Sequence, residues 1–407
     1  MNAAIGEICE IENLAGDTQL AEVIGLNNGM ASILPFEPMH GVTLNTNVTC
    51  LNRALEVPCG IELLGRVVDG LGRPIDGKGP IRSSQFVEVG NSVPSPMDRQ
   101  AINKPFVTGQ RVVDGLLTLG QGQRVGLFAG SGIGKSTLLG EIAKGSESDI
   151  NVVALIGERG REVKPFLQDC LGEKGLEKSI CVVSTAEQTP LMRVRAAQTA
   201  VEIAGHFRSL GANVLMLLDS TTRIAMAQRE IGQILNEVPG SRGYTPSVFS
   251  LLSSLLEQLG ASDRGTITGI ITVLVDGDDM DEPIADAVRG IVDGHIVMDR
   301  KLAEKGFFPA IDVGRSISRV FREVTSREHQ EAAAKCRHIE ATYNDVSELI
   351  RIGAYQTGSD PKIDLSRKLI EALNAFKSQS IGEHTSIQDT VATLGQIAGK
   401  WDYKAFE

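Results

Sequence analysis

The chain has little of what marks a membrane, secreted or nucleic-acid-binding protein. No uncharged apolar run approaches ~20 residues, the length that a membrane-spanning helix needs, and the opening MNAAIGEICEIEN lacks the basic and apolar regions of a signal peptide. Only 4% of the 407 residues are aromatic, and the net charge is −11. An acidic chain poor in aromatic residues is unsuited to neutralising phosphates or stacking bases. We therefore expect a cytoplasmic protein that does not bind nucleic acid.

Cysteine and histidine are also scarce, with six of each. The cysteines are scattered from Cys9 to Cys336, and no two of them have CxxC spacing. The histidines do not pair at metal-ligand spacing either. Reduced thiols in a cytosol are favoured over disulfides. We expect no structural metal.

Three zones follow one another along the chain, which is long enough for two or three domains. Short β-type runs separated by turn signals predict a small β-barrel over residues 1–85. Residues 86–325 alternate apolar strands with helical stretches, and residues 326–407 read as amphipathic helices. The predicted class is α/β, with a central mostly parallel sheet of the RecA-like P-loop kind. Its candidate strands are Arg124–Phe128, Asn151–Ile156, Ile180–Thr185, Asn213–Asp219 and Thr266–Asp276.

The stretch FAGSGIGKST (Phe128–Thr137) joins one of these strands to a predicted helix. Backbone N–H groups of such a loop point at anionic oxygens, Lys135 would reach the β- and γ-phosphates, and the hydroxyl of Ser136 would bind Mg²⁺. The pattern asks for glycine at Ala129, where a methyl is tolerable if φ is negative. A chance glycine turn is disfavoured by the flanking strand and helix. The expected nucleotide contacts are Gly130, Ser131, Gly132, Ile133, Gly134, Lys135, Ser136 and Thr137.

Two carboxylates follow other strands of the predicted sheet. Asp219 ends the strand in NVLMLLDSTTR, where a carboxylate associated with Mg²⁺ belongs, although an aspartate there can also cap a helix. Glu158 ends the strand in LIGERGREV, at the edge where open α/β sheets bind ligands. It could deprotonate an attacking water, or it could lie in a solvated charged loop; spacing alone does not decide.

Together these stretches resemble the catalytic subunits of rotary ATPases. The chain as a whole looks most like the bacterial type III export ATPases of the flagellum or the injectisome, over nearly its full length. The similarity is carried by LLGRVVDGLGRPID, FAGSGIGKST, LIGERGREV, LLDSTTRIAMAQREI, GYTPSVFS, VDGDDMDEPIADAVRGIVDGHIVMDRKLAEKGFFPAIDVGRSISRV and IGAYQTGSDPKID.

The resemblance implies roles for residues around the phosphates. Glu158 matches the family's general base, with Arg159 and Glu162 as neighbouring members of that network. Asp219 matches the aspartate associated with Mg²⁺. The implied cofactors are therefore ATP and Mg²⁺.

It also implies roles that no local pattern reveals. Arg319, in FPAIDVGRSISRV, matches the arginine finger that reaches the γ-phosphate of the neighbouring subunit. Phe308 matches the aromatic residue that stacks on adenine, and Tyr355 is expected to close the adenine pocket. Without the family, Arg319 is an ordinary surface arginine and Phe308 an ordinary core residue.

The resembled family forms homohexamers with ATP between subunits. Its loop matching NEVPGSRGYTPSVFS faces a central pore occupied by a coiled-coil stalk protein. Its C-terminal helical domain meets the export gate, chaperones and unfolded substrates, at the inner face of the cytoplasmic membrane. The family normally has another barrel strand, preceded by a helix that binds a stator-like regulator. Because IGEICEI comes almost at once here, we expect an incomplete barrel and weaker hexamerisation.

Three other functions are alternatives to an export ATPase for this chain. The catalytic subunit of a rotary ATP synthase is disfavoured because this one chain carries both the base-type Glu158 and the finger-type Arg319, which the synthase divides between two kinds of subunit. A non-catalytic nucleotide-binding subunit would lack the base. A hexameric RNA translocase is disfavoured by the acidic balance. The segments IGAYQTGSDPKID and DGDDMDEPIAD look closer to flagellar than to injectisome members.

Overall fold

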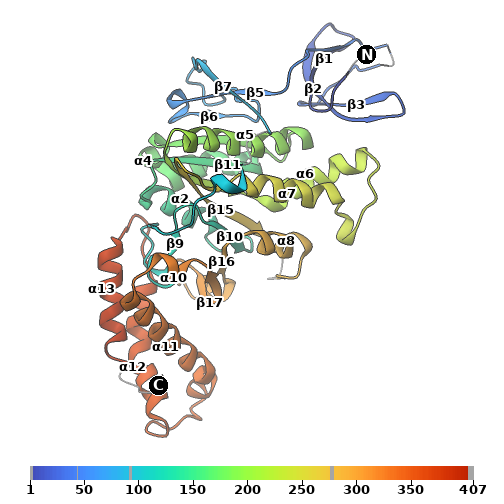
Figure 1. Ribbon diagram of the computed structural model, residues 1–407. Helices are drawn as coiled ribbons and strands as arrows, with labels where there is room; N and C mark the ends of the chain where they lie inside the picture. Colours follow the sequence, from blue (N-terminus) through green and yellow to red (C-terminus); the bar gives the residue numbers. More distant parts are fainter. Residues whose placement is uncertain (1–2, 44, 91–93, 276–278, 402–407) are drawn as a thin grey trace.

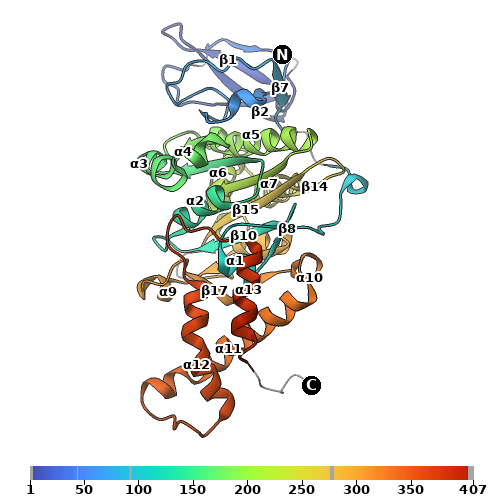
Figure 2. The ribbon, with the colours of Figure 1, turned by 90° about the vertical axis from the view of Figure 1, so that its left-hand side faces the viewer.

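The computed structural model describes residues 3–43, 45–90, 94–275 and 279–401. Three regions follow one another along the long axis of the molecule: β-structure near the N-terminus, a helix-covered sheet in the middle and helices near the C-terminus (Figures 1 and 2). None of the helices in these ranges is long and apolar enough to span a membrane.

The middle region is built on a nine-stranded sheet in the order β17-β16-β10-β15-β13-β11-β12-β6, with β14 paired to β15. All its pairs are parallel except β14 with β15 and β16 with β17, so the predicted mostly parallel sheet is confirmed. Its strands are β6 (Val67–Val68), β10 (Arg124–Ala129), β11 (Ile150–Glu158), β12 (Ser179–Thr185), β13 (Asn213–Asp219), β14 (Gly260–Ala261), β15 (Thr266–Leu274), β16 (Gly294–Met298) and β17 (Ile311–Ser318). The last predicted strand ends two residues early, and Asp276 lies outside the described residues.

Both faces of this sheet are apolar because successive side chains of a strand point to opposite sides. In β11, Val153 and Leu155 pack into one core, whereas Val152, Ala154 and Ile156 pack into the other. The helices of the middle region are α1 (Arg111–Leu116), α2 (Lys135–Gly145), α3 (Gly160–Pro165), α4 (Gly172–Glu177), α5 (Pro190–Ser209), α6 (Thr221–Ile234), α7 (Pro246–Glu257), α8 (Pro283–Ile291), α9 (Arg300–Glu304) and α10 (Phe321–Val324). Side chains of α1 and α2 pack in the first core, and side chains of α5 to α8 pack in the second. The helices thus cover the two faces of the sheet and leave the carboxyl ends of its strands open at one edge.

The N-terminal region divides into separate pieces. Strands β1 (Ile8–Glu12), β2 (Thr18–Asn27), β3 (Met30–Pro35) and β4 (Val48–Cys50) pair antiparallel in the order β3-β2-β1-β4. Among the described residues β3 and β4, at the two ends of this order, do not pair with each other, and the expected incomplete barrel stays a prediction. Strand β5 (Glu56–Cys59) pairs with β7 (Gln85–Glu88), whereas β6 between them joins the central sheet. These strand pairings do not test the predicted domain boundaries after residues 85 and 325, which stay predictions.

The C-terminal region consists of α11 (Arg327–Arg351), α12 (Pro361–Lys377) and α13 (Ile387–Ala398). Ser326, Asp360 and Ser386 cap these helices by accepting hydrogen bonds from backbone N–H groups in their first turns. The predicted helical C-terminal region is confirmed. Side chains of all three share one core with α1 and α2, so this region packs directly on the sheet region.

Candidate active site

The glycine loop lies where β10 ends and α2 begins. Gly132 (φ 77°) and Gly134 (φ 90°) adopt the left-handed conformation that favours glycine. Ala129 is not among the residues with positive φ; it is buried, and its carbonyl accepts the N–H of Val275 at 3.2 Å. The departure from the usual pattern at Ala129 is thus accommodated as expected. The first turn of α2 presents backbone N–H groups with no helical partner, which is a ready site for phosphate.

Charged side chains from three neighbouring elements converge beside this loop. The ammonium of Lys135, at the start of α2, contacts Oδ1 of Asp219 and lies 3.9 Å from Oε1 of Glu158. The three side chains are 11%, 3% and 13% exposed, so their charges interact in a largely dry environment. The carboxylate oxygens of Asp219 and Glu158 therefore lie together beside the loop, and oxygen atoms are the ligands that Mg²⁺ prefers.

Asp219 is held in place by the sheet and does not cap a helix. Helix α6 is preceded by Ser220 as its N-cap residue, without a side-chain cap. The carboxylate of Asp219 instead accepts a hydrogen bond from the hydroxyl of Thr272 on β15, at 2.8 Å. The helix-cap alternative is therefore wrong, and Asp219 faces the phosphate site.

Glu158 is mostly buried, so the alternative of a solvated loop is wrong for this residue. Gly157 (φ 71°) interrupts the register of β11 and turns the side chain of Glu158 toward Lys135. Burial raises the pKa of Glu158 and the nearby Asp219 raises it further, while Lys135 and Arg223 act in the opposite direction. A carboxyl whose pKa is raised toward neutrality is better matched to act as a general base.

Arg223, in the first turn of α6, is a site residue that the sequence reasoning did not single out. Its guanidinium donates to the carbonyl of Gly157, and Nε lies 3.4 Å from Oε1 of Glu158. A Cβ on Gly157 would lie 2.9 Å from the Cβ of Arg223, so the glycine permits this approach. The signal for Arg223 was its place four residues after Asp219, at the same edge of the sheet.

The structure does not bring Arg159 to the convergent charges. Its side chain is 61% exposed and pairs at 3.5 Å with Glu162, which is 47% exposed. The catalytic role of Arg159 stays a prediction.

A cavity of about 610 Å³ adjoins the glycine loop. Phe308 lines it, and an aromatic carbon of Phe308 would lie 3.5 Å from a Cβ on Gly134. Across the cavity lies the segment after α12. Other lining residues are Gln110, Gly132, Thr137, Leu138, Glu141, Met298, Pro309, Ser378, Gln379, Ser380 and Ile381.

Tyr355 is not among the described residues that line this cavity, so its role at the adenine pocket stays a prediction. It lies in the turn between α11 and α12, where its hydroxyl bonds to the carbonyl of Asp360 and to the carboxylate of Asp364, both at 3.1 Å. That turn is at the far end of the C-terminal helices (Figure 1). The segment 378–381 lines the cavity instead, and no local sequence pattern pointed to it.

Arg319 lies at the opposite edge of the sheet from the glycine loop. It is exposed, its N–H donates to the carbonyl of Asp293 at 3.0 Å, and Asp293 N–H in turn donates to the carbonyl of Arg124 at 2.8 Å. Arg319 is therefore level with the first residue of β10. The loop begins after the last residue of that strand, roughly 16 Å further along at the usual rise per residue. Arg319 consequently does not serve the phosphate site of its own chain.

A glycine loop at a helix start, flanked by a buried aspartate and a glutamate on neighbouring parallel strands, defines a P-loop nucleotide hydrolase. Residues 109–318 match the nucleotide-binding domain of the ATP synthase alpha/beta family, and residues 1–52 match its beta-barrel domain. Residues 325–396 match the C-terminal domain of the type III secretion ATPase EscN. The chain belongs to the ATP synthase alpha/beta family and is an ATPase of its flagellar and type III secretion group.

Relatives of both kinds are similar over nearly the whole chain. The flagellum-specific ATP synthase of Bacillus subtilis is 47% identical over 399 residues, 98% of this chain and 91% of that protein. The type 3 secretion system ATPase of Xanthomonas euvesicatoria is 44% identical over 98% of this chain and 90% of its own. The assembled ATPase EscN of the enteropathogenic E. coli type III secretion system has a TM-score of 0.92 at 43% identity, over 98% of this chain and 96% of that one. The resemblance in the sequence is confirmed.

Proposed function

We propose that this chain is the Mg²⁺-dependent ATPase of a protein export apparatus and works as a homohexamer with ATP at subunit interfaces. The observation that carries the proposal is that Glu158 and Arg319 belong to one chain but lie at opposite edges of its sheet. A ring of identical subunits turns the Arg319 edge of one protomer toward the phosphate site of the next. EscN is described as an assembled ATPase, which supports this arrangement.

The glycine loop and Lys135 bind the phosphates in this proposal. The hydroxyl of Ser136 and the carboxylate of Asp219 would hold Mg²⁺, which supplies positive charge at the phosphate oxygens. The donors fit this ion because both are oxygen atoms, and Thr272 already fixes the carboxylate of Asp219. Lys135, now paired with Asp219, then turns to the phosphates.

Glu158 accepts a proton from the attacking water in the proposed reaction, and Arg223 holds its carboxylate in place. Arg319 from the neighbouring protomer stabilises the charge on the transferred phosphoryl group. Phe308 stacks on adenine in the cavity beside the loop. Arg159 is assigned a supporting role in the network of Glu158.

The proposed partners follow from exposed apolar segments and from the relatives. The segment between α6 and α7 extends away from the sheet (Figure 1), and Val238 within it is 81% exposed. A structure of EscN with its central stalk EscO supports a stalk protein as the partner of this segment. We assign the export gate and chaperone–substrate complexes to the C-terminal helices, a stator-like regulator to the N-terminal region, and a peripheral place at the cytoplasmic membrane. We favour the flagellar apparatus over the injectisome.

The proposal is tested by measuring phosphate release across protein concentrations that span assembly, as followed by size-exclusion chromatography. We expect specific activity to rise steeply with assembly and Arg319→Ala to be inactive at every concentration. Lys135→Ala is the control for activity that does not come from this site. A specific activity independent of concentration, together with an active Arg319→Ala, would overturn the shared site.

A further inference from the structure

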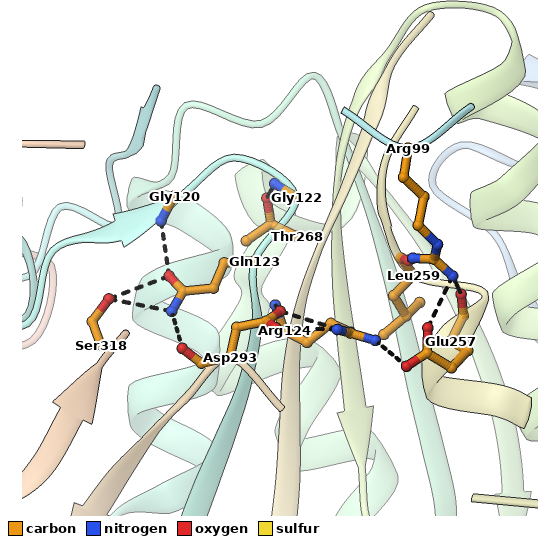
Figure 3. A network of polar contacts seen from close by, with 10 residues as sticks. All are labelled: Arg99, Gly120, Gly122, Gln123, Arg124, Glu257, Leu259, Thr268, Asp293 and Ser318. Atoms are coloured by element: carbon orange, nitrogen blue, oxygen red, sulfur yellow. Dashed lines mark hydrogen bonds and ion pairs between the residues drawn. The ribbon is translucent and has the colours of Figure 1, made fainter. Parts of the chain in front are cut away.

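A network of polar side chains lies at the edge of the sheet opposite the glycine loop (Figure 3). It joins the residues just before β10, just before β16 and at the end of β17. These are Gln123, Asp293 and Ser318, and Arg319 follows directly. No role in phosphate binding accounts for this network, because the phosphates bind at the other edge.

Gln123 is completely buried, and both ends of its side-chain amide are used. Its Oε1 accepts the N–H of Gly120 at 2.9 Å, and its Nε2 donates to the carbonyl of Asp293 at 2.9 Å and to the hydroxyl of Ser318 at 3.2 Å. Because one neighbour is a donor and another an acceptor, the orientation of the amide is determined. The amide therefore links three separate backbone segments.

Two of these bonds end at the residues that set the main chain of Arg319. The carbonyl of Asp293 accepts from Gln123 and also from the N–H of Arg319. The hydroxyl of Ser318 donates to the carbonyl of Thr118 at 2.9 Å. Strand β17 is at the end of the strand order and pairs only with β16 in this sheet, so these side-chain bonds add to the pairing of its last residues.

The side chain of Arg319 has little support of its own. It is exposed, and within the described residues its Nη2 donates one long hydrogen bond, to the carbonyl of Arg289 at 3.5 Å. Asp293 is firmly placed, since its carboxylate forms a two-pronged pair with Arg124, which also bonds to Glu257 at 2.7 Å. Figure 3 shows this chain of contacts running from Ser318 to Glu257.

We propose that Gln123 and Ser318 are positioning residues for Arg319, acting in the active site of the neighbouring protomer. The proposal rests on the proposed role of Arg319 as an arginine finger. A misplacement of a catalytic group by about 1 Å can cost about 10²-fold in rate, so fixing the main chain at Ser318 matters for a finger that must reach across an interface.

The first variant is Ser318→Ala, which removes one hydroxyl from a buried site, and the second is Gln123→Leu. Loss of one such hydrogen bond is expected to lower kcat for ATP hydrolysis about tenfold with little change in KM, because the finger acts in the transition state. Thr268→Val is the matched control. It removes an equally buried hydroxyl that accepts from Gly122 at 2.9 Å, at the same edge but without contact to Ser318.

Subunit mixing then separates an effect through Arg319 from damage to the variant's own phosphate site. At the same total protein concentration, Ser318→Ala mixed with an equal amount of Glu158→Ala should exceed the activity of Ser318→Ala alone. Intact phosphate sites of the first variant then meet intact fingers of the second. Mixed with Arg319→Ala, it should show no gain, because every finger is weak or missing.

The reverse pattern, gain with Arg319→Ala and none with Glu158→Ala, would overturn the proposal and place the defect in the variant's own phosphate site. Equal kinetics of Ser318→Ala, Gln123→Leu and Thr268→Val would overturn it as well.

The reference mixture of Glu158→Ala with Arg319→Ala distinguishes failure of the shared site from failure of the positioning role. If that mixture stays inactive, the shared site fails; if it recovers while Ser318→Ala shows the reverse pattern, only the positioning role fails. Thermal melting of each variant shows whether a low activity comes from misfolding. Gln123→Leu tests the same positioning role if Ser318→Ala misfolds.

Discussion

The two edges of the central sheet carry different chemistry on one frame. At the carboxyl edge, Lys135, Asp219 and Glu158 are mostly buried, and Lys135 lies close to both carboxylates. At the amino edge, Arg319 is exposed and contacts none of them. A site complete in one chain would place these groups together. In the proposed homohexamer, their separation by the length of a strand means that each protomer contributes one edge to each of two sites.

The edges also differ in how they are held. The carboxyl edge is held mainly by opposite charges, whereas at the amino edge a neutral buried amide, Gln123, and a hydroxyl, Ser318, act beside the ion pair of Arg124 with Asp293. Charges at the first edge will rearrange when phosphates arrive. The second edge keeps its hydrogen bonds, since none of them involves the ligand.

The largest expected effect comes from the amino edge. Arg319→Ala should lower kcat by about 10³–10⁵, the range found for arginine fingers supplied in trans. Arg319→Lys should recover little, because an ammonium lacks the planar fork of donors. Stopped-flow binding of a fluorescent ATP analogue would test the comparison. If Arg319→Ala abolished binding to single protomers, the two edges would not be separate.

The next effect comes from the base at the carboxyl edge. Glu158→Gln should lower kcat by about 10²–10⁴ while leaving nucleotide binding intact, because the amide cannot accept the proton from water. Glu173→Gln, an exposed carboxylate on α4, is the matched control and should behave as the unmodified protein. Single-turnover hydrolysis would distinguish the two; full activity of Glu158→Gln would contradict the assignment.

The pH dependence gives a smaller but sharper test of the same edge. The pKa of Glu158 is raised above its ordinary 4.5, first by burial and then by Asp219. A base works only when deprotonated, so kcat/KM should fall as the pH is lowered through this raised pKa, with the acidic limb above pH 4.5. Glu158→Gln should remove the limb from the residual activity. A limb at the ordinary value would show that Glu158 is more solvated than the structure indicates.

The smallest effect is expected in the cavity beside the loop. Phe308→Ala should raise KM for ATP by about tenfold through lost stacking, with kcat little changed. Tyr355→Ala should leave KM unchanged, since the structure places Tyr355 in the turn between α11 and α12. A raised KM for Tyr355→Ala would restore the sequence-based assignment through a neighbouring subunit.

The functional residues at the carboxyl edge could be predicted from the sequence better than those at the amino edge, for a physical reason. The glycine loop is a local motif, and Asp219 and Glu158 end buried strands whose carboxyl ends must meet at one edge of a parallel sheet. Arg319 and Phe308 were assigned through the family resemblance alone, because their partners are distant in sequence. The two-residue strand β6 is too short to leave a periodic pattern, so its joining the central sheet was not foreseen.

The site residues that were missed share one feature. Arg223, Gln123 and the segment 378–381 act through contacts with segments that are far away along the chain. Gln123 contacts Asp293 across 170 positions of sequence, and no spacing rule connects them. Tyr355 too was assigned through the family resemblance alone, and its hydroxyl has partners in its own turn.

The central claim, that each active site is shared between two protomers, is tested most directly by mixing Glu158→Ala with Arg319→Ala in varied proportions at constant total protein. A shared site predicts activity that is near zero for either variant alone and greatest near equal amounts. There, up to about a quarter of the interfaces of a symmetric ring join an intact base to an intact finger. Activity that stayed at the level of the single variants at every ratio, with mixed assembly confirmed by differently tagged subunits, would contradict the account.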